Sequence, residues 1–204
     1  MTTIDMHNHT VFSPDSTATP EESVEKAIEA GLDGIAFTEH QSFTDQGRVE
    51  MLRRRYRDRI MVFSGAEYTA AEGHVLLFGI KEDDLRQFGL HLPVIEIVRL
   101  VNERNGAVVV PHPFREWLLF QAEIGKVGGI SAIEACNGHT SRDDNHRAMS
   151  AARALGLPTT GGSDSHSKDE VGRCYTEFDT DVNYANFIET LKRGGYRGVY
   201  GKGY

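Results

Sequence analysis

The chain has 204 residues, of which 39% are hydrophobic and 25% charged, and its formal net charge is −8 at pH 7. This composition excludes an intrinsically disordered chain, and no apolar run approaches the roughly 20 residues of a membrane span. No signal peptide precedes the first predicted strand, and two cysteines, Cys136 and Cys174, imply no disulfide framework. We therefore expect a cytoplasmic protein without a membrane partner, whose acidic balance disfavours broad attraction to nucleic acid.

Predicted strands and helices alternate along the chain. A strand at residues 3–7 is followed by a helix over 19–31, which Thr19 can cap and Gly31 can end. The remaining predicted strands cover residues 33–40, 60–68, 74–80, 107–113, 130–137, 157–166 and 171–178. The remaining predicted helices cover residues 46–59, 93–106, 142–156 and 182–195. The Gly/Tyr-rich tail beyond these could be a last strand, a contact surface or a frayed end.

This alternation predicts an α/β fold. Strands separated by helices of about 10–15 residues indicate βαβ units and parallel strands. No linker, repeat or low-complexity segment interrupts the pattern, so we expect a single domain over residues 1–204. Polar residues at the ends of several strands favour a barrel, because barrels gather their sites at the carboxyl ends of the strands.

Residues that can bind a metal mark most of the predicted strands. His7 and His9 are two residues apart and, with Asp5, would share one face of the first strand. Asp164 and His166 repeat this spacing late in the chain. The other candidates lie at strand ends or in the adjoining loops, and they are Asp15, His40, Glu67, His74 and His112. So many imidazole and carboxylate ligands exceed the needs of one ion and predict two or three divalent ions of manganese, zinc or iron.

Five short motifs carry a resemblance to a known family. "DMHNHT", "TEH", "GAEY", "HPF" and "GGSDSH" occur in this order, from Asp5 to the segment before Phe178. They resemble the motifs of the PHP (polymerase and histidinol phosphatase) family. The resemblance implies a distorted (β/α)7 barrel with a site for two or three metal ions.

The same resemblance divides the candidate ligands among three ions. One ion would be held by His7, His9, Glu67 and Asp164, a second by Glu67, His74 and His112, and the third by Asp15, His40 and His166. Glu67 and Asp164 would be the catalytic carboxylates, acting through the metals. Some relatives have histidine in place of Asp15, so the metal and the affinity of the third site stay open.

Charge counting indicates an anionic substrate. Three divalent ions would bring about six positive charges, and the three carboxylates with a bridging hydroxide would contribute about four negative charges. The remaining net charge of about +2 matches a phosphate dianion. We expect hydrolysis of a phosphate ester by metal-bound hydroxide at a di- or trinuclear site, with a phosphomonoester of a small metabolite or nucleotide as substrate.

Several alternatives stay open. Among enzymes they are a phosphodiesterase or nuclease, a histidinol-phosphate or protein-tyrosine phosphatase, and a hydrolase of a non-phosphate substrate. An alternative outside the enzymes is a non-catalytic metal-binding module. Nucleic acid is therefore expected only as a substrate, and the sequence leaves the oligomeric state open.

Loops after the predicted strands supply candidate substrate contacts. Arg115, Arg142 and Arg173 could clamp a phosphate, because a guanidinium group presents a fork of donors. Asn137 and His139 lie at and after the end of the strand over 130–137, where they could touch substrate or support a ligand.

Other polar or aromatic features have a structural interpretation. The arginine-rich run at residues 53–59 is expected to form a solvated helix face, since helical geometry spreads its charges around the axis. His91 and His146 are expected at the surface, and Trp117 in the core. Glu39, next to His40, could orient a neighbouring ligand or face solvent, and the sequence leaves its role unassigned.

Overall fold

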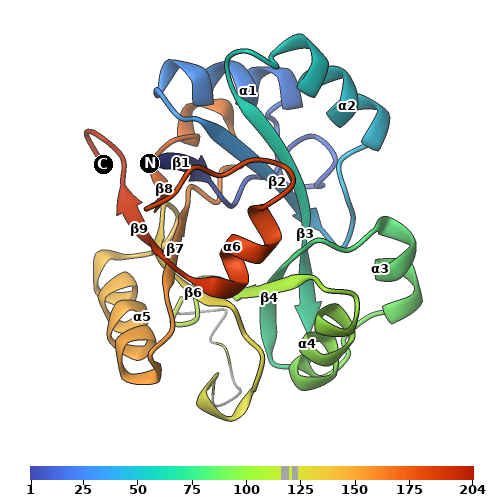
Figure 1. Cartoon of the computed structure of the whole chain (residues 1–204), viewed down its shortest axis with the longest axis vertical. Helices are drawn as coiled ribbons and strands as arrows, with labels where there is room; N and C mark the ends of the chain where they lie inside the picture. The colour runs from blue at the N-terminus through green and yellow to red at the C-terminus, as the bar shows by residue number, and fades with distance from the viewer. Residues whose placement is uncertain (116–119, 121–123) are drawn as a thin grey trace.

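A computed structural model describes residues 1–115, 120 and 124–204, and Trp117 therefore lies outside the described residues (Figure 1). Within these ranges one nine-stranded sheet has the order β7-β6-β5-β4-β3-β2-β1-β8-β9. The strands are β1 (Thr2–Asp5), β2 (Gly34–His40), β3 (Met61–Ala70), β4 (Gly73–Phe78), β5 (Ala107–Val110), β6 (Ala132–Asn137), β7 (Thr159–Gly162), β8 (Cys174–Phe178) and β9 (Tyr196–Tyr200).

The first seven strands form a nearly closed barrel. β1, β2 and β3 are parallel neighbours, as are β5, β6 and β7. Beyond β7 the chain returns to β1: the Asp164 amide donates to the His7 carbonyl at 2.7 Å, and the His9 amide donates to the Ser165 carbonyl at 2.9 Å. The prediction of a distorted α/β barrel is therefore confirmed.

Two of the predicted strands, β4 and β8, depart from the all-parallel expectation, and β8 pairs antiparallel with β1. β4 is antiparallel to both β3 and β5. Only residues 71–72 join β3 to β4, and a parallel connection needs a crossover of a dozen or more residues. This reversal brings His74, near the start of β4, to the same end of the barrel as the last residues of β3. The Gly/Tyr-rich tail forms β9, which pairs antiparallel with β8.

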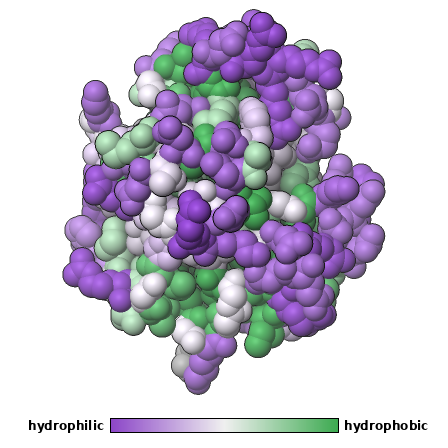
Figure 2. Space-filling view, in the orientation of Figure 1, coloured by the Kyte–Doolittle hydropathy of each residue, from purple (hydrophilic) through white to green (hydrophobic). Residues whose placement is uncertain are grey.

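Helices cover the outside of the sheet, as Figure 1 shows. They are α1 (Pro20–Glu29), α2 (Gln46–Arg55), α3 (Glu82–Phe88), α4 (Val94–Glu103) and α5 (Arg142–Leu155), and a further helix, α6 (Phe187–Arg193), lies elsewhere. The predicted cap of α1 at Thr19 is present as a capping box, in which the Thr19 side chain accepts from the Glu22 amide and the Glu22 side chain accepts from the Thr19 amide. α2 ends earlier than predicted, because Tyr56 leaves the helical conformation and turns the chain so that Ile60 enters the core. Hydrophilic side chains cover the α1 and α2 end of the face in Figure 2.

The helix α6 closes one end of the barrel. Phe187 and Leu191 on α6 pack with Ile4, Phe63 and Phe78 from the strands. Figure 1 shows α6 in the middle of the ring of strands. Burying each of these large apolar side chains contributes about 1.5–3 kcal/mol. Because the amino ends of the parallel strands are filled in this way, the polar side chains gather at their carboxyl ends.

In the part of the chain that the structure describes, no helix combines the length and the apolar character that a membrane span requires.

Candidate metal centre

All nine residues predicted as ligands lie around the carboxyl end of the barrel. His7 and His9 follow β1, His40 ends β2, and Glu67 lies in β3. The others are His74 in β4, Asp15 in the loop after His9, His112 after β5, and Asp164 and His166 after β7. His7, His9, Glu67, His112 and Asp164 are at most 2% exposed. Ionisable groups buried this deeply have to be paired with each other or with a metal.

Glu67 lies at the centre of the cluster. Its Oε2 atom is 2.9 Å from His40 Nδ1, 3.4 Å from His9 Nε2 and 3.6 Å from His7 Nε2. Its Oε1 atom is 2.8 Å from His74 Nδ1 and 3.1 Å from His112 Nε2. The two oxygens of one carboxylate thus face two separate sets of histidines, which is the arrangement of a bridging ligand.

Asp164 lies across the same pocket from Glu67. Its Oδ1 atom is 3.2 Å from His9 Nε2 and 3.4 Å from His7 Nε2. The Nε2 atoms of His7 and His9 are themselves only 3.2 Å apart. These imidazole and carboxylate atoms therefore converge on one point.

A third group lies at the rim. Asp15 Oδ2 is 3.2 Å from His40 Nε2 and 3.3 Å from His166 Nε2, and the Asp15 side chain is 51% exposed. The His9 ring stacks against His40 at 4.2 Å and lies 4.6 Å from His166. The rim therefore combines the three predicted residues with His9.

The donor set fits divalent metal ions. Within the described residues, four trios place one ligand atom from each member within 4.8 Å of the others. The trios are His7–His9–Glu67, Glu67–His74–His112, His7–His112–Asp164 and His9–His40–His166. In addition, the Nδ1 atom of His112 is buried without a hydrogen-bond partner, a costly state that a nearby cation or water would relieve.

Strained backbone accompanies the cluster. His112 has a φ of 31° and Asp164 a φ of 52°, and Gln41, directly after His40, has a φ of 53°. Residues other than glycine rarely adopt this left-handed region, and each instance costs on the order of 1–3 kcal/mol. The strain lies just beyond β2, β5 and β7, at the carboxyl ends of strands where the candidate ligands gather.

The pKa shifts follow from burial and mutual attraction. Burial opposes the charged forms of Glu67 and Asp164, but the facing histidines hold the pKa of both carboxyls well below the usual range. Burial also opposes protonation of His7, yet Asp164, Glu134 and Glu67 keep its pKa well above the usual value. The cluster therefore offers anionic carboxylates, and metal uptake has to displace a proton from His7.

Two buried carboxylates were given no role from the sequence. Glu134 in β6 is fully buried, and its Oε1 atom lies 3.1 Å from His7 Nδ1. Its Oε2 atom accepts from the His112 amide at 3.3 Å and from Asn137 Nδ2 at 2.8 Å. Glu39 is also fully buried. For both residues, the signal available in the sequence was a glutamate within a mostly apolar strand. Burying its charge is costly unless a partner is present.

Asp5 does not join the cluster, contrary to the expectation from the sequence. Its carboxylate accepts from the amides of Ser163 at 2.8 Å and Gly172 at 3.0 Å, and burial raises its pKa to about 6. β1 ends at Asp5, so the alternation of a strand does not continue to His7.

Two of the predicted substrate contacts lie beside the cluster. Arg115 pairs with the Asp164 carboxylate, and its Nη2 atom donates to Asn137 Oδ1 at 2.9 Å. Asn137 also donates to Asp164 at 3.2 Å. Arg115 therefore presents a guanidinium group directly against a candidate ligand.

The other three predicted contacts lie further around the rim. His139 stacks on His166 at 5.3 Å and pairs with Glu170 at 2.8 Å. Arg173 also pairs with Glu170, at 3.2 Å. The Arg142 guanidinium lies 3.6 Å from the centre of the Tyr200 ring. Arg142 is thus placed against an aromatic ring rather than against the cluster.

Gly162 permits β7 to approach His7 closely. A Cβ atom at this position would lie 2.4 Å from His7 Cβ and 2.8 Å from Glu134 Oε1. We predict that Gly162→Ala lowers the free energy of unfolding by about 1–3 kcal/mol and displaces His7. Denaturant unfolding and metal analysis check this result. Gly128→Ala is the matched control because no atom lies within 4 Å of its added Cβ, and equal losses in both variants would contradict the prediction.

The comparisons with known proteins agree with this geometry. The PHP domain model matches residues 5–125, and a PHP-associated model matches residues 142–196. An uncharacterized protein of Methanocaldococcus jannaschii is 27% identical over 120 residues, which cover 54% of this chain and 67% of that protein. Candidate ligands come from both matched regions, and they meet in one cluster.

Solved structures share the fold. A two-domain protein from Bacteroides vulgatus containing a predicted PHP-like metal-dependent phosphoesterase has a TM-score of 0.77 at 20% identity. The likeness covers 98% of this chain and 65% of that protein. A lesion-specific endonuclease from Pyrococcus furiosus has a TM-score of 0.66 at 18% identity, covering 97% of this chain and 57% of the endonuclease. At these identities the likeness shows a common fold.

Proposed function

The chain belongs to the PHP domain family, and from that premise we propose that it is a metal-dependent phosphoesterase that hydrolyses a phosphomonoester of a small metabolite or nucleotide. The observation that carries the proposal is the Glu67 carboxylate, whose two oxygens face separate sets of histidines. Paired metal ions suit phosphoryl chemistry. When bound, they lower the pKa of water and neutralise the phosphoryl oxygens.

We assign the chain's own residues the following roles. His7, His9, Glu67 and Asp164 hold the inner ion, and Glu67 shares a second ion with His74 and His112. Asp15, His40 and His166 hold a third ion at the rim, where the exposure of Asp15 leaves the ion open to exchange. The whole chain works as one domain, since Asp164 and His166 complete sites that the first half begins.

Charge favours a monoester over a diester. A phosphomonoester carries up to two negative charges near neutral pH, whereas a diester carries one. Arg115 adds a fixed positive charge beside Asp164, at the edge of the proposed metal sites. The net charge of −8 also disfavours long nucleic acids as substrates, because their affinity depends on neutralising many phosphates.

Turnover of para-nitrophenyl phosphate and of its bis-para-nitrophenyl diester, each with manganese and with chelator, tests the proposal. We expect chelator-sensitive turnover of the monoester that His9→Ala abolishes. Faster turnover of the diester would instead support a phosphodiesterase or nuclease. If metal is bound but neither ester nor a panel of metabolite monoesters is hydrolysed, the proposed activity is wrong.

Arg115 is proposed to bind the phosphate. Arg115→Lys keeps the charge but loses the planar fork, so kcat/KM for a monoester should fall by about 10–100-fold, the equivalent of one or two charge-assisted hydrogen bonds. Metal content should stay unchanged. Arg142→Lys serves as the control, because its guanidinium lies on Tyr200, and it should change kcat/KM less than about threefold. Equal effects of the two substitutions would contradict a specific role for Arg115.

A further inference from the structure

A row of five side chains crosses the inner site. Glu134 Oε1 is 3.1 Å from His7 Nδ1, and His7 Nε2 is 3.2 Å from His9 Nε2. His9 Nδ1 is 3.3 Å from Ser13 Oγ, which is 2.6 Å from Glu39 Oε2. Each of the five is at most 2% exposed. The row is therefore shielded from water and has a carboxylate at each end.

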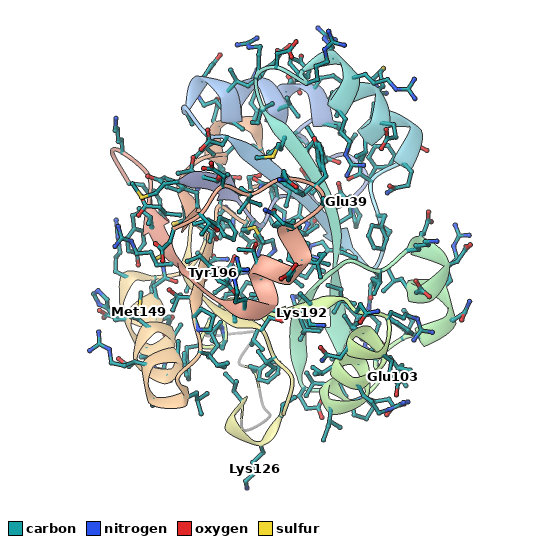
Figure 3. The ribbon with its side chains drawn as sticks, viewed as in Figure 1. Glu39, Glu103, Lys126, Met149, Lys192 and Tyr196 are labelled. Carbon is teal, nitrogen blue, oxygen red and sulfur yellow. The ribbon has the colours of Figure 1, made fainter. Side chains whose placement is uncertain are left out.

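Glu39 fixes the direction of the hydrogen bond that Ser13 makes. Figure 3 labels Glu39 among the strands, away from the outer helix that carries Glu103. Its carboxylate accepts from the Thr10 amide at 3.0 Å and from the hydroxyl groups of Thr10, Thr44 and Ser13 at 2.6, 2.7 and 2.6 Å. A carboxylate only accepts, so the Ser13 hydroxyl hydrogen points at Glu39. The lone pairs of Ser13 Oγ are left for other donors.

The direction of these hydrogen bonds determines which histidine nitrogens carry hydrogen. Because Ser13 Oγ can only accept from His9, His9 Nδ1 has to carry the hydrogen. At the other end of the row, the Glu134 carboxylate can only accept, so His7 Nδ1 has to carry a hydrogen as well. Both rings then turn Nε2 toward one point, where the lone pair of His9 Nε2 is free for a cation and that of His7 Nε2 becomes free once its proton is displaced.

We propose that Ser13 and Glu39 are positioning residues that hold His9 in the tautomer that binds metal, and that Glu134 does the same for His7. The inference rests on the proposed metal centre and adds residues that act on it through other residues. Of the two interpretations that the sequence leaves open for Glu39, the proposal selects orientation of a ligand and identifies that ligand as His9.

Ser13 also connects the inner site to the rim. Its Oγ atom accepts from the His40 amide at 3.1 Å, and the loop that it anchors carries Asp15 two residues further on. Ser16 ties the same loop to the carbonyls of His9 and His166 at 3.0 and 3.2 Å. Loss of the Ser13 hydroxyl should therefore loosen both the inner and the rim ligands.

Ser13→Ala tests the inference, and Thr44→Val is its matched control. Both substitutions remove one hydroxyl donor from Glu39, but only Ser13→Ala breaks the connection to His9. Long-range ¹H–¹⁵N NMR of the metal-free chain reports the His9 tautomer, and competition with a chromophoric chelator reports zinc affinity. In Ser13→Ala, we expect His9 to populate both tautomers and zinc binding to weaken by about 10–100-fold. Thr44→Val should keep the His9 tautomer and the zinc affinity of the parent chain. Ser13→Thr, which keeps the hydroxyl, should restore both signals.

Two results would overturn the inference. One is an unchanged His9 tautomer and zinc affinity in Ser13→Ala. The other is an equal loss in Thr44→Val, which would make Glu39 a structural residue only. Because neither readout needs a substrate, failure of the proposed hydrolysis is distinguishable: a chain with the expected tautomer and zinc affinity but no turnover would contradict only the hydrolysis.

Discussion

Glu67→Gln is expected to lower monoester turnover by at least about 1,000-fold. The amide keeps the shape of the side chain but removes its charge and one acceptor oxygen. One set of histidines, either His7, His9 and His40 or His74 and His112, would then face an NH₂ group. Losing a shared ion removes several kcal/mol of transition-state stabilisation, and each 1.36 kcal/mol is about tenfold in rate.

The measurement for Glu67→Gln combines steady-state kinetics with metal analysis of the purified variant. Metal content should fall by about one ion per chain or more, because Glu67 lies within 3.6 Å of both sets of histidines, whereas Asp164 approaches the second set only at His112, at 4.0 Å. Glu103→Gln, on the exposed side of α4, is the matched control. Turnover within tenfold of the parent, with normal metal content, would rule out a bridging role for Glu67.

Metal removal is expected to lower the melting temperature strongly. Five ionisable side chains of the cluster are at most 2% exposed, so the folded state without metal keeps buried charges in incomplete pairs. Free metal at about 1,000 times its Kd stabilises the fold by about 4 kcal/mol for one site. For a chain of this size, that stabilisation corresponds to a difference in melting temperature of about 8–16 °C.

Calorimetry with chelator and with added manganese measures this shift. Glu67→Gln should reduce it, since the variant holds fewer ions. The expectation fails if metal analysis shows ions being removed and restored while the melting temperature stays constant.

The structure brings the nine candidate ligands together, and the sequence indicates them because their signal is local. Each of the nine is a metal-binding residue type at or near the end of a strand, and the strands themselves follow from short apolar runs. The two-residue spacing of His7 and His9 is visible in the sequence, although β1 ends before both residues. Their convergence therefore depends on the turn beyond Asp5, and the expectation that Asp5 shares their face was wrong, since its carboxylate binds the Ser163 and Gly172 amides.

Other parts of the site depend on contacts that no local pattern contains. Glu134 lies 127 residues from His7 in the sequence, and only closure of the barrel brings them together. Glu39 meets Ser13 from 26 residues away. A buried carboxylate signals that a partner exists but does not say which one. The short helix α3 was missed for a different reason, since seven residues give too few turns for a hydrophobic period.

Turnover of a phosphomonoester followed during stepwise addition of manganese to the metal-free chain tests the central claim most directly. The account predicts no turnover without metal and a rise that accompanies the second ion, as expected for a site bridged by Glu67. Undiminished turnover in the metal-free chain, or turnover already complete with a single ion bound, would contradict it.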